Sequence, residues 1–257
     1  MILQGKVFIS TVSIHKSVEI RNVFEPLGAT VVDFPMTEFI EADQTPEIQY
    51  SIKQIEKYQW IIFTSANGVK YFHHLLYETT NLSSIPSGIK IAVVGPKTAL
   101  ELKNTGRTAN YTGLGSTAEN MVNELIENEL VQNCNILFPL GNLAPDTTQI
   151  RLSKIAEVTR INVYKTVKTE VSDNESVERI KNKRYDLVLF TSPSGVANFT
   201  ETLGPQYVNP ELRVACIGKV TTKAAEQYGL RCMITAKTST YEGLANEIIN
   251  YYYKTKN

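Results

Sequence analysis

Cysteine, histidine and tryptophan are scarce in this sequence, and neither sign of charge is in excess. Its 257 residues include three cysteines, three histidines and one tryptophan, and 26 basic residues balance 26 acidic ones. The cysteines, Cys134, Cys216 and Cys232, have no C-x-x-C spacing and no neighbouring histidine. We therefore interpret them as small buried residues of a protein in a reducing compartment, and we expect neither a disulfide nor a metal site.

The sequence also lacks a basic excess, a long apolar run and a signal-peptide pattern. Proteins that bind nucleic acid usually carry a basic excess or patch, so we expect no nucleic-acid partner. No apolar stretch approaches the roughly 20 residues that span a bilayer, so we expect no membrane partner and a cytoplasmic location. An anionic small ligand stays open, because backbone N–H groups at helix starts bind anions without adding net charge.

Short apolar runs, typical of strands buried on both faces, alternate with helical patterns along the chain. The predicted strands are 6–10, 30–34, 60–64, 90–94, 135–139, 160–167, 186–190 and 213–217. Between them, one helix is predicted to begin at the cap Thr45, and others end at Gly28 and Gly229. This alternation predicts an α/β protein with parallel sheets covered by helices on both faces.

Three phrases occur twice in the chain, in the same order and at an offset of 127 or 123 residues. The pairs are FTSANGV (63–69) with FTSPSGV (190–196), VVGPKTA (93–99) with CIGKVTT (216–222), and STAENMVNELI (116–126) with STYEGLANEII (239–249). The offset is far longer than the roughly 20 to 50 residues of a solenoid repeat. The pattern therefore predicts two domains that are built alike.

The first two repeated phrases are predicted to lie where a strand ends and a helix begins, which is where open α/β sheets bind ligands. Hydroxyl groups and free N–H groups at such a turn suit a ligand with several carboxylates. The candidate substrate-binding residues are Thr64, Ser65, Asn67, Gly68, Gly95, Thr98, Ser192, Ser194, Gly195, Gly218 and Thr221. Because the same residue types cap helices in all kinds of proteins, a purely structural role is the alternative.

Competing motifs fit less well. GLGSTA at 113–118 matches a dinucleotide fingerprint but lacks the acidic residue about 20 positions further on, so we interpret it as a turn. GKVT at 218–221 lacks the first glycine of a phosphate loop, since Arg213 stands in that position. Tyr164 lies on a predicted strand, and its residue type alone indicates an ordinary strand aromatic.

Taken together, the phrases WIIFTSANGV, VVGPKTA, VYKT, LFTSPSGVANF, CIGKVTTKAAEQYGL and STYEGLANEII resemble the uroporphyrinogen-III synthase family over most of the chain and in the family's order. The resemblance implies two similar doubly wound, parallel-sheet (flavodoxin-like) α/β domains joined by a two-stranded linker. One domain would hold 1–34 and 169–257, and the other 40–161. The linker would consist of 35–39 and 162–168.

The resemblance also implies a reaction, which closes linear hydroxymethylbilane to uroporphyrinogen III in tetrapyrrole biosynthesis. Water is lost, and ring D is inverted through a spiro intermediate. The implied protein is a cyclising hydro-lyase that needs no cofactor, acts as a monomer and has a linear tetrapyrrole as its partner. Tyr164 would lie on the linker, facing a cleft between the domains, and would assist departure of the hydroxyl group as a hydrogen-bond donor or general acid.

The chain departs from the family's usual pattern at two places. Where the first strand of many members ends in a Thr-Arg pair, this chain has FISTVS at 8–13, with no arginine, and Pro145 stands where many members have another arginine. Both changes remove a candidate partner for a carboxylate. A non-catalytic two-domain clamp for an anionic metabolite is therefore the alternative, and a two-domain glycosyltransferase is a more distant one.

Overall fold

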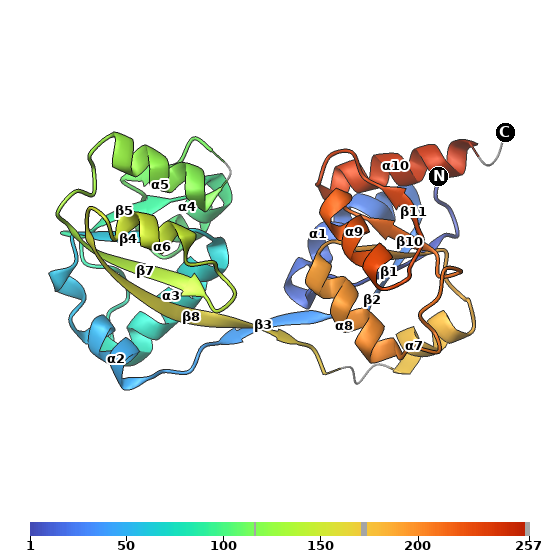
Figure 1. Ribbon diagram of the computed structural model, residues 1–257, viewed down its shortest axis with the longest axis horizontal. Helices are drawn as coiled ribbons and strands as arrows, with labels where there is room; N and C mark the ends of the chain where they lie inside the picture. Colours follow the sequence, from blue (N-terminus) through green and yellow to red (C-terminus); the bar gives the residue numbers. More distant parts are fainter. Residues whose placement is uncertain (116, 171–173, 255–257) are drawn as a thin grey trace. The chain divides into compact units, whose positions relative to one another are not determined.

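The computed structural model describes residues 1–115, 117–170 and 174–254, and it divides into two compact units (Figure 1). Unit 1 consists of Met1–Glu38 and Val167–Asn257, and unit 2 is Phe39–Thr166. Ser116, the first residue of one repeated phrase, lies outside the described residues. Each unit contains an open sheet built on parallel strand pairs, so the predicted α/β class is confirmed.

The sheet of unit 2 has the strand order β3-β8-β7-β4-β5-β6. Its strands are β3 (Thr37–Glu41), β4 (Trp60–Phe63), β5 (Lys90–Val93), β6 (Tyr111–Thr112), β7 (Asn135–Gly141) and β8 (Glu157–Lys168). Its helices are α2 (Pro46–Lys53), the 3-10 helix η2 (Ile55–Lys57), α3 (Ala66–Thr80), α4 (Pro96–Asn104), α5 (Ala118–Glu127) and α6 (Thr147–Leu152). Both β3 and β8 include residues of unit 1 at one end, so these two strands connect the units.

Strand β4 is buried on both faces because helices cover each side of the sheet. Ile61 and Phe63 belong to a core shared with α2, α3 and α4. Trp60 and Ile62 belong to a second core, shared with α5 and α6. This double burial explains why WIIF is apolar at every position and shows no alternation.

The sheet of unit 1 has the strand order β11-β10-β9-β1-β2. Its strands are β1 (Val7–Ser10), β2 (Thr30–Asp33), β9 (Leu187–Phe190), β10 (Val214–Cys216) and β11 (Cys232–Thr235). Its helices are α1 (Ile14–Phe24), the 3-10 helix η1 (Glu25–Leu27), α7 (Asn174–Lys181), α8 (Pro193–Leu203), α9 (Lys219–Gln227) and α10 (Tyr241–Lys254). Counted along the chain, this is the order 2-1-3-4-5, which is the flavodoxin-like order that was predicted.

The helices of unit 1 also form two layers, and each layer contributes to its own core. Phe8 of β1 packs in a core with α1 and α10. Its neighbour Ile9 packs in a core with α7, α8 and α9. The layers match those of unit 2, since α8 and α9 carry the same repeated phrases as α3 and α4, and α10 carries the same phrase as α5.

The two sheets have the same spatial order of strands but a different order along the chain. From one edge, β11-β10-β9-β1-β2 of unit 1 corresponds to β6-β5-β4-β7-β8 of unit 2. In unit 2 these strands are contiguous in sequence, whereas unit 1 takes its last two from the beginning of the chain. Unit 1 is thus a circularly permuted copy of unit 2, which accounts for the repeat and its offset.

All eight predicted strands are present, and their bounds differ from the prediction by a few residues. The largest difference is at 160–167, which lies within the twelve-residue strand β8. Three strands were not predicted as such: β6, which has two residues, the edge strand β11, and β3, which was predicted only as part of the linker. The predicted helix signals are confirmed: Thr45 Oγ1 accepts the Ile48 N–H at 3.4 Å, and Gly28 and Gly229 have φ of 96° and 76°.

Candidate functional site

The start of α3 holds the first group of predicted site residues. Strand β4 ends at Phe63, and Ser65 caps the helix by accepting the Gly68 N–H at 3.0 Å. A Cβ on Gly68 would lie 3.3 Å from Ser65 Oγ and 3.5 Å from the Pro139 carbonyl oxygen. The Gly68 N–H is therefore used inside the turn, and this glycine lets the helix start approach β7 closely. Thr64 and Asn67 are half-buried in the same turn.

Tyr164 lies beside this helix start, although 99 residues separate it from Ser65. Its hydroxyl oxygen is 3.5 Å from Ser65 Oγ, and either atom could be the donor. The side chain is half-buried. The structure therefore brings together two predicted site residues, a serine hydroxyl and a tyrosine hydroxyl, within unit 2.

Gly141 leaves the space that the ring of Tyr164 occupies. The two residues are partners in the β7–β8 ladder, which shifts its register between Leu140 and Gly141. A Cβ on Gly141 would lie 2.5 Å from Cζ and 2.8 Å from the hydroxyl oxygen of Tyr164. Any larger residue would displace the ring. The sequence interpretation did not include Gly141, and its only sequence signal is a glycine at the end of a predicted apolar strand.

Two further aromatic residues contact the Tyr164 ring. Tyr71, on α3, stacks on it with ring centroids 5.6 Å apart and an interplanar angle of 28°. Phe39, on β3, packs edge-on at 5.7 Å and 82°. The Tyr71 hydroxyl donates to the Phe39 carbonyl oxygen at 2.6 Å. The sequence interpretation predicted neither residue.

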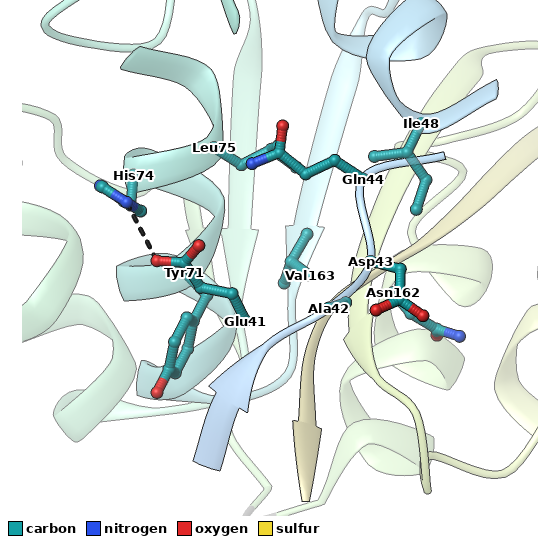
Figure 2. Close-up of a pocket in the computed structure, with 10 residues that line it drawn as sticks. All are labelled: Glu41, Ala42, Asp43, Gln44, Ile48, Tyr71, His74, Leu75, Asn162 and Val163. Atoms are coloured by element: carbon teal, nitrogen blue, oxygen red, sulfur yellow. Dashed lines mark ion pairs between the residues drawn. The ribbon is translucent and has the colours of Figure 1, made fainter. Parts of the chain in front are cut away.

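A pocket lies near this aromatic group, between β3, the segment that follows it, α2, α3 and β8 (Figure 2). Glu41 and His74 point toward each other there and form an ion pair at 3.0 Å. Asp43, a second acidic residue of the lining, pairs with Lys165. None of the predicted site residues lines the pocket.

The start of α4 presents backbone rather than side chains. Gly95 has extended backbone angles, and a Cβ added there would meet no described heavy atom within 4 Å. The Thr98 side chain is buried, with 5% of its surface exposed. Gly95 is therefore open to close approach, whereas Thr98 packs inward and supports the turn.

Unit 1 repeats these helix starts with its own residues. Ser192 accepts the Gly195 N–H at 3.1 Å, and its Oγ lies 3.2 Å from that of the exposed Ser194. Thr11 Oγ1 lies 3.5 Å from a Cβ placed on Gly195. Thr11 belongs to the β1–α1 turn, which sequence interpretation left out of the site.

In unit 1, the start of α9 is more enclosed than the start of α4, its counterpart in unit 2. A Cβ on Gly218 would lie 2.5 Å from Ser239 Oγ. Thr221 is 3% exposed. Gly218 therefore packs against Ser239, which is the first residue of the repeated phrase at 239–249.

Of the GLGSTA segment at 113–118, residues 113–115 lie in a loop after β6, and Ser116 lies outside the described residues. The carboxylate of Glu124 accepts the N–H groups of Leu114 at 3.0 Å and Gly115 at 3.1 Å, and the Tyr111 hydroxyl at 2.9 Å. The bond from Leu114 is the main cause that lowers the pKa of Glu124 below its ordinary value. The glycines thus serve a loop that is bound to α5.

Metal ligands are not grouped in the part of the chain that the structure describes, where no cluster of three or more His, Cys, Asp and Glu side chains could hold an ion. Nor does any helix within 1–115, 117–170 and 174–254 combine the length and apolar character needed to cross a membrane.

Comparison with known families decides the assignment. The family model described as "Uroporphyrinogen-III synthase HemD" matches residues 18–246, which cover all of unit 2 and most of unit 1. The chain belongs to the uroporphyrinogen-III synthase family. The predicted family is confirmed, and with it the prediction of a cyclising lyase of porphyrin biosynthesis. The non-catalytic clamp is not favoured.

Individual relatives agree with the uroporphyrinogen-III synthase assignment. The chain is 26% identical over 251 residues to the uroporphyrinogen-III synthase of Synechococcus elongatus, covering 94% of each protein. It is 24% identical over 220 residues to that of Chlorobaculum parvum, covering 84% of this chain and 87% of the relative. It is also 26% identical over 227 residues to the porphyrin biosynthesis protein HemD of Ruminiclostridium josui, but this match spans only 44% of that longer protein.

Solved structures of the family share the fold. A mutant uroporphyrinogen-III synthase of Thermus thermophilus matches 98% of this chain and 100% of its own, with a TM-score of 0.59 and 15% identity. The enzyme of Helicobacter pylori matches 96% and 99%, with a TM-score of 0.60 and 14% identity. At such low identity these matches concern the fold, and they confirm the prediction of two flavodoxin-like units.

Proposed function

We propose that this chain converts linear hydroxymethylbilane to uroporphyrinogen III, with loss of water and inversion of ring D. The observation that carries the proposal is the match of the uroporphyrinogen-III synthase family model to residues 18–246. The contact between Ser65 and Tyr164 supports it, since a tyrosine hydroxyl beside a helix start suits a reaction in which a hydroxyl group must leave.

In the proposed reaction, Tyr164 donates a hydrogen bond or a proton to the departing hydroxyl group of the substrate. The resulting azafulvene is attacked by ring D through its already substituted carbon, which gives a spiro intermediate that fragments and closes again. Unassisted closure gives the other isomer, so control of the substrate's conformation is the main catalytic contribution. Ser65 is within reach to orient the tyrosine hydroxyl.

The carboxylates of the substrate are proposed to bind at the predicted helix starts. Gly95 and Ser194 are the most accessible of these residues, because Gly95 faces open space and Ser194 is exposed. Three exposed apolar side chains, two in unit 2 and one in unit 1, also follow the carboxyl ends of strands in their own unit and suit contact with pyrrole rings. They are Leu114 (92% exposed), Leu143 (66%) and Val220 (73%). A ligand with both apolar rings and carboxylates would use both kinds of contact.

The remaining expectations belong to the same proposal. The functional domains are 1–34 with 169–257 and 40–161, and 35–39 and 162–168 form the linker between them. The enzyme works as a monomer in the cytoplasm and needs no cofactor. Its three cysteines are free thiols, as a reducing compartment would keep them.

The test is an isomer assay. Purified protein is incubated with freshly prepared hydroxymethylbilane, and the products are oxidised and separated by chromatography. The proposal predicts an excess of the type III isomer over a control without protein. Formation of the type I isomer alone would overturn it.

A further inference from the structure

We propose that Tyr71 and Gly141 are positioning residues that together set the direction of the Tyr164 hydroxyl group. The proposal rests on the function proposed for Tyr164. It goes further in assigning a task to two residues that have no predicted contact with the substrate, and it begins from the constraints on the Tyr164 ring.

Backbone and aromatic side chains confine that ring together. At Gly141 the backbone comes so close that even a methyl group would overlap Cζ and the hydroxyl oxygen. Tyr71 stacks on the ring, and Phe39 packs edge-on to it. Both centroid distances fall in the range of roughly 4.5–7 Å that favours aromatic pairs. Rotation of the ring away from Ser65 would break at least one of these contacts.

Tyr71 is itself held in place by the strand that joins the units. Its hydroxyl donates to the Phe39 carbonyl oxygen at 2.6 Å. On α3, His74 lies three residues further on and pairs with Glu41, the last residue of β3. Ser65, the hydroxyl neighbour of Tyr164, caps the helix that also carries Tyr71, the ring that stacks on Tyr164. Through Tyr71 and His74 this helix is tied to β3.

Comparison with unit 1 shows which contact of Tyr71 is structural and which one is specific to the candidate site. The residue of α8 that corresponds to Tyr71 is Asn198, as the offset of 127 residues shows. Its Nδ2 donates to the Met36 carbonyl oxygen at 2.8 Å, three residues before Phe39. Both copies thus tie their helix to the backbone of the same connecting segment. An asparagine is sufficient for that bond, so the aromatic ring in unit 2 meets a different need, which is contact with Tyr164.

This comparison supplies the decisive variants. Tyr71→Asn adopts the residue of unit 1 and removes the stacked ring, whereas Tyr71→Phe keeps the ring and removes the bond to Phe39. Gly141→Ala places a methyl group against the Tyr164 ring. Each is made alone and together with Tyr164→Phe. Tyr77→Asn, on an exposed side chain of the same helix, is the control.

The expected kinetic result is strong coupling to the Tyr164 hydroxyl. Tyr71→Asn and Gly141→Ala should each lower kcat by about tenfold, as expected for a displaced acid–base group, with a smaller change in KM. In the Tyr164→Phe background they should have little further effect, because residues that act through one group are not additive. Tyr71→Phe should retain more activity than Tyr71→Asn. Equal losses in both backgrounds would overturn the proposal.

A second measurement does not depend on activity. In protein labelled with ¹³Cζ-tyrosine, the Tyr164 resonance is identified by its loss in Tyr164→Phe. It should shift in Tyr71→Asn and in Gly141→Ala and stay in place in Tyr77→Asn. If the wild type makes only the type I isomer, the proposed function is wrong, and the resonance still tests the positioning. An unmoved resonance in both variants would contradict the positioning even in a fully active enzyme.

Discussion

Strand β2 of unit 1 stops after four residues, whereas its counterpart in unit 2, β8, continues for twelve. The shared part of these strands is equivalent pair by pair. Ser10 opposite Asp33 is the fourth pair in unit 1, and Phe138 opposite Arg160 is the fourth pair in unit 2. Tyr164 lies beyond that point, in the continuous part of β8. The equivalent stretch of unit 1 is interrupted at 34–36 and resumes as the separate strand β3, whose first residue, Thr37, has the position that corresponds to Tyr164. The duplicated fold is therefore common to both units, and the difference is local: unit 1 has a threonine, Thr37, where unit 2 has the candidate catalytic Tyr164.

The fourth pair also shows how opposite charges perform the same structural task. Asp33 accepts hydrogen bonds from Ser17 Oγ at 2.5 Å and from Arg21 at 2.6 Å, which ties β2 to α1. Arg160 donates to the Ala144 carbonyl oxygen at 3.0 Å and pairs with Asp146, which ties β8 to the segment before α6. Each side chain holds the crossover segment that precedes its strand.

The largest expected effect is in the cores, and there the two units should respond alike. Phe72 packs edge-on against Phe63 at 5.4 Å, and Phe199 packs in the same way against Phe190 at 5.0 Å. Phe72→Ala and Phe199→Ala should each destabilise the unit that contains it by about 3–5 kcal/mol, since both phenylalanines are fully buried. Urea unfolding followed by hydrogen exchange of each unit measures this. If both variants lost stability in the same unit, the two phenylalanines would not have equivalent roles in their units.

The next effect should fall on unit 2 alone. Tyr164→Phe should slow uroporphyrinogen III formation by about tenfold or more while the fold is retained, because only the hydroxyl group is removed. The matched control is Tyr185→Phe in unit 1, whose hydroxyl lies 3.5 Å from the Arg213 nitrogen. The assay is the initial rate with the isomer ratio. Wild-type rates for Tyr164→Phe would remove this tyrosine from the mechanism.

Removing a helix cap should lower the stability of either unit by a similar amount, but only the cap in unit 2 should affect the enzyme's activity. Ser65→Ala and Ser192→Ala each lose the bond to a glycine N–H and should cost about 1 kcal/mol. Ser65→Ala should in addition lower kcat, because Ser65 also lies beside Tyr164. Thermal unfolding and the isomer assay separate the two effects. A greater loss of activity in Ser192→Ala would reverse the assignment of the site to unit 2.

The smallest effect is a local pH dependence in the loop before α5. The pKa of Glu124 is lowered in the folded protein, chiefly by the Leu114 N–H. Its carboxylate therefore stabilises the loop above the unfolded pKa of about 4.3, and this contribution is lost as pH falls through the folded value. The Leu114 and Gly115 amide resonances should titrate with a midpoint below the ordinary glutamate range.

The corresponding residue of unit 1 provides the control for this titration. It is Glu247, which forms an ion pair with Lys237 at 3.1 Å. Glu124→Gln should abolish the titration of Leu114 and Gly115, whereas Glu247→Gln should leave it unchanged. A titration that persists in Glu124→Gln would show that another group controls the loop.

Much of the fold could be predicted because its signals are local. Buried strands such as WIIF are apolar at every position, and Thr45, Gly28 and Gly229 mark helix ends by backbone chemistry that involves few neighbours. The division into two similar domains was predicted from the repeat, because each copy of a phrase supports the interpretation of the other copy. Strand β6 was missed because two residues carry no periodic pattern.

The site was only partly predictable because its contacts join distant parts of the chain. Ser65 was predicted from its phrase, and Tyr164 from a family resemblance. The need for Gly141 depends on a register shift between β7 and β8, which no local pattern encodes. The role of Tyr71 appears only when a helix, a connecting strand and β8 meet. Thr98 and Thr221 show that a repeated phrase can also overpredict the site. Both were predicted to bind substrate, and yet both residues are buried.

The permuted order of unit 1 has a consequence for synthesis on the ribosome. Strand β1 lies between β2 and β9 in the sheet, and Phe8 is paired with Leu187. At about 5–20 residues per second, β1 waits roughly ten seconds or longer for that partner. Unit 2 is contiguous from Phe39 to Thr166 and can close in the meantime. We therefore expect the N-terminal strand–helix–strand segment to be the part of the nascent chain that chaperones must shield.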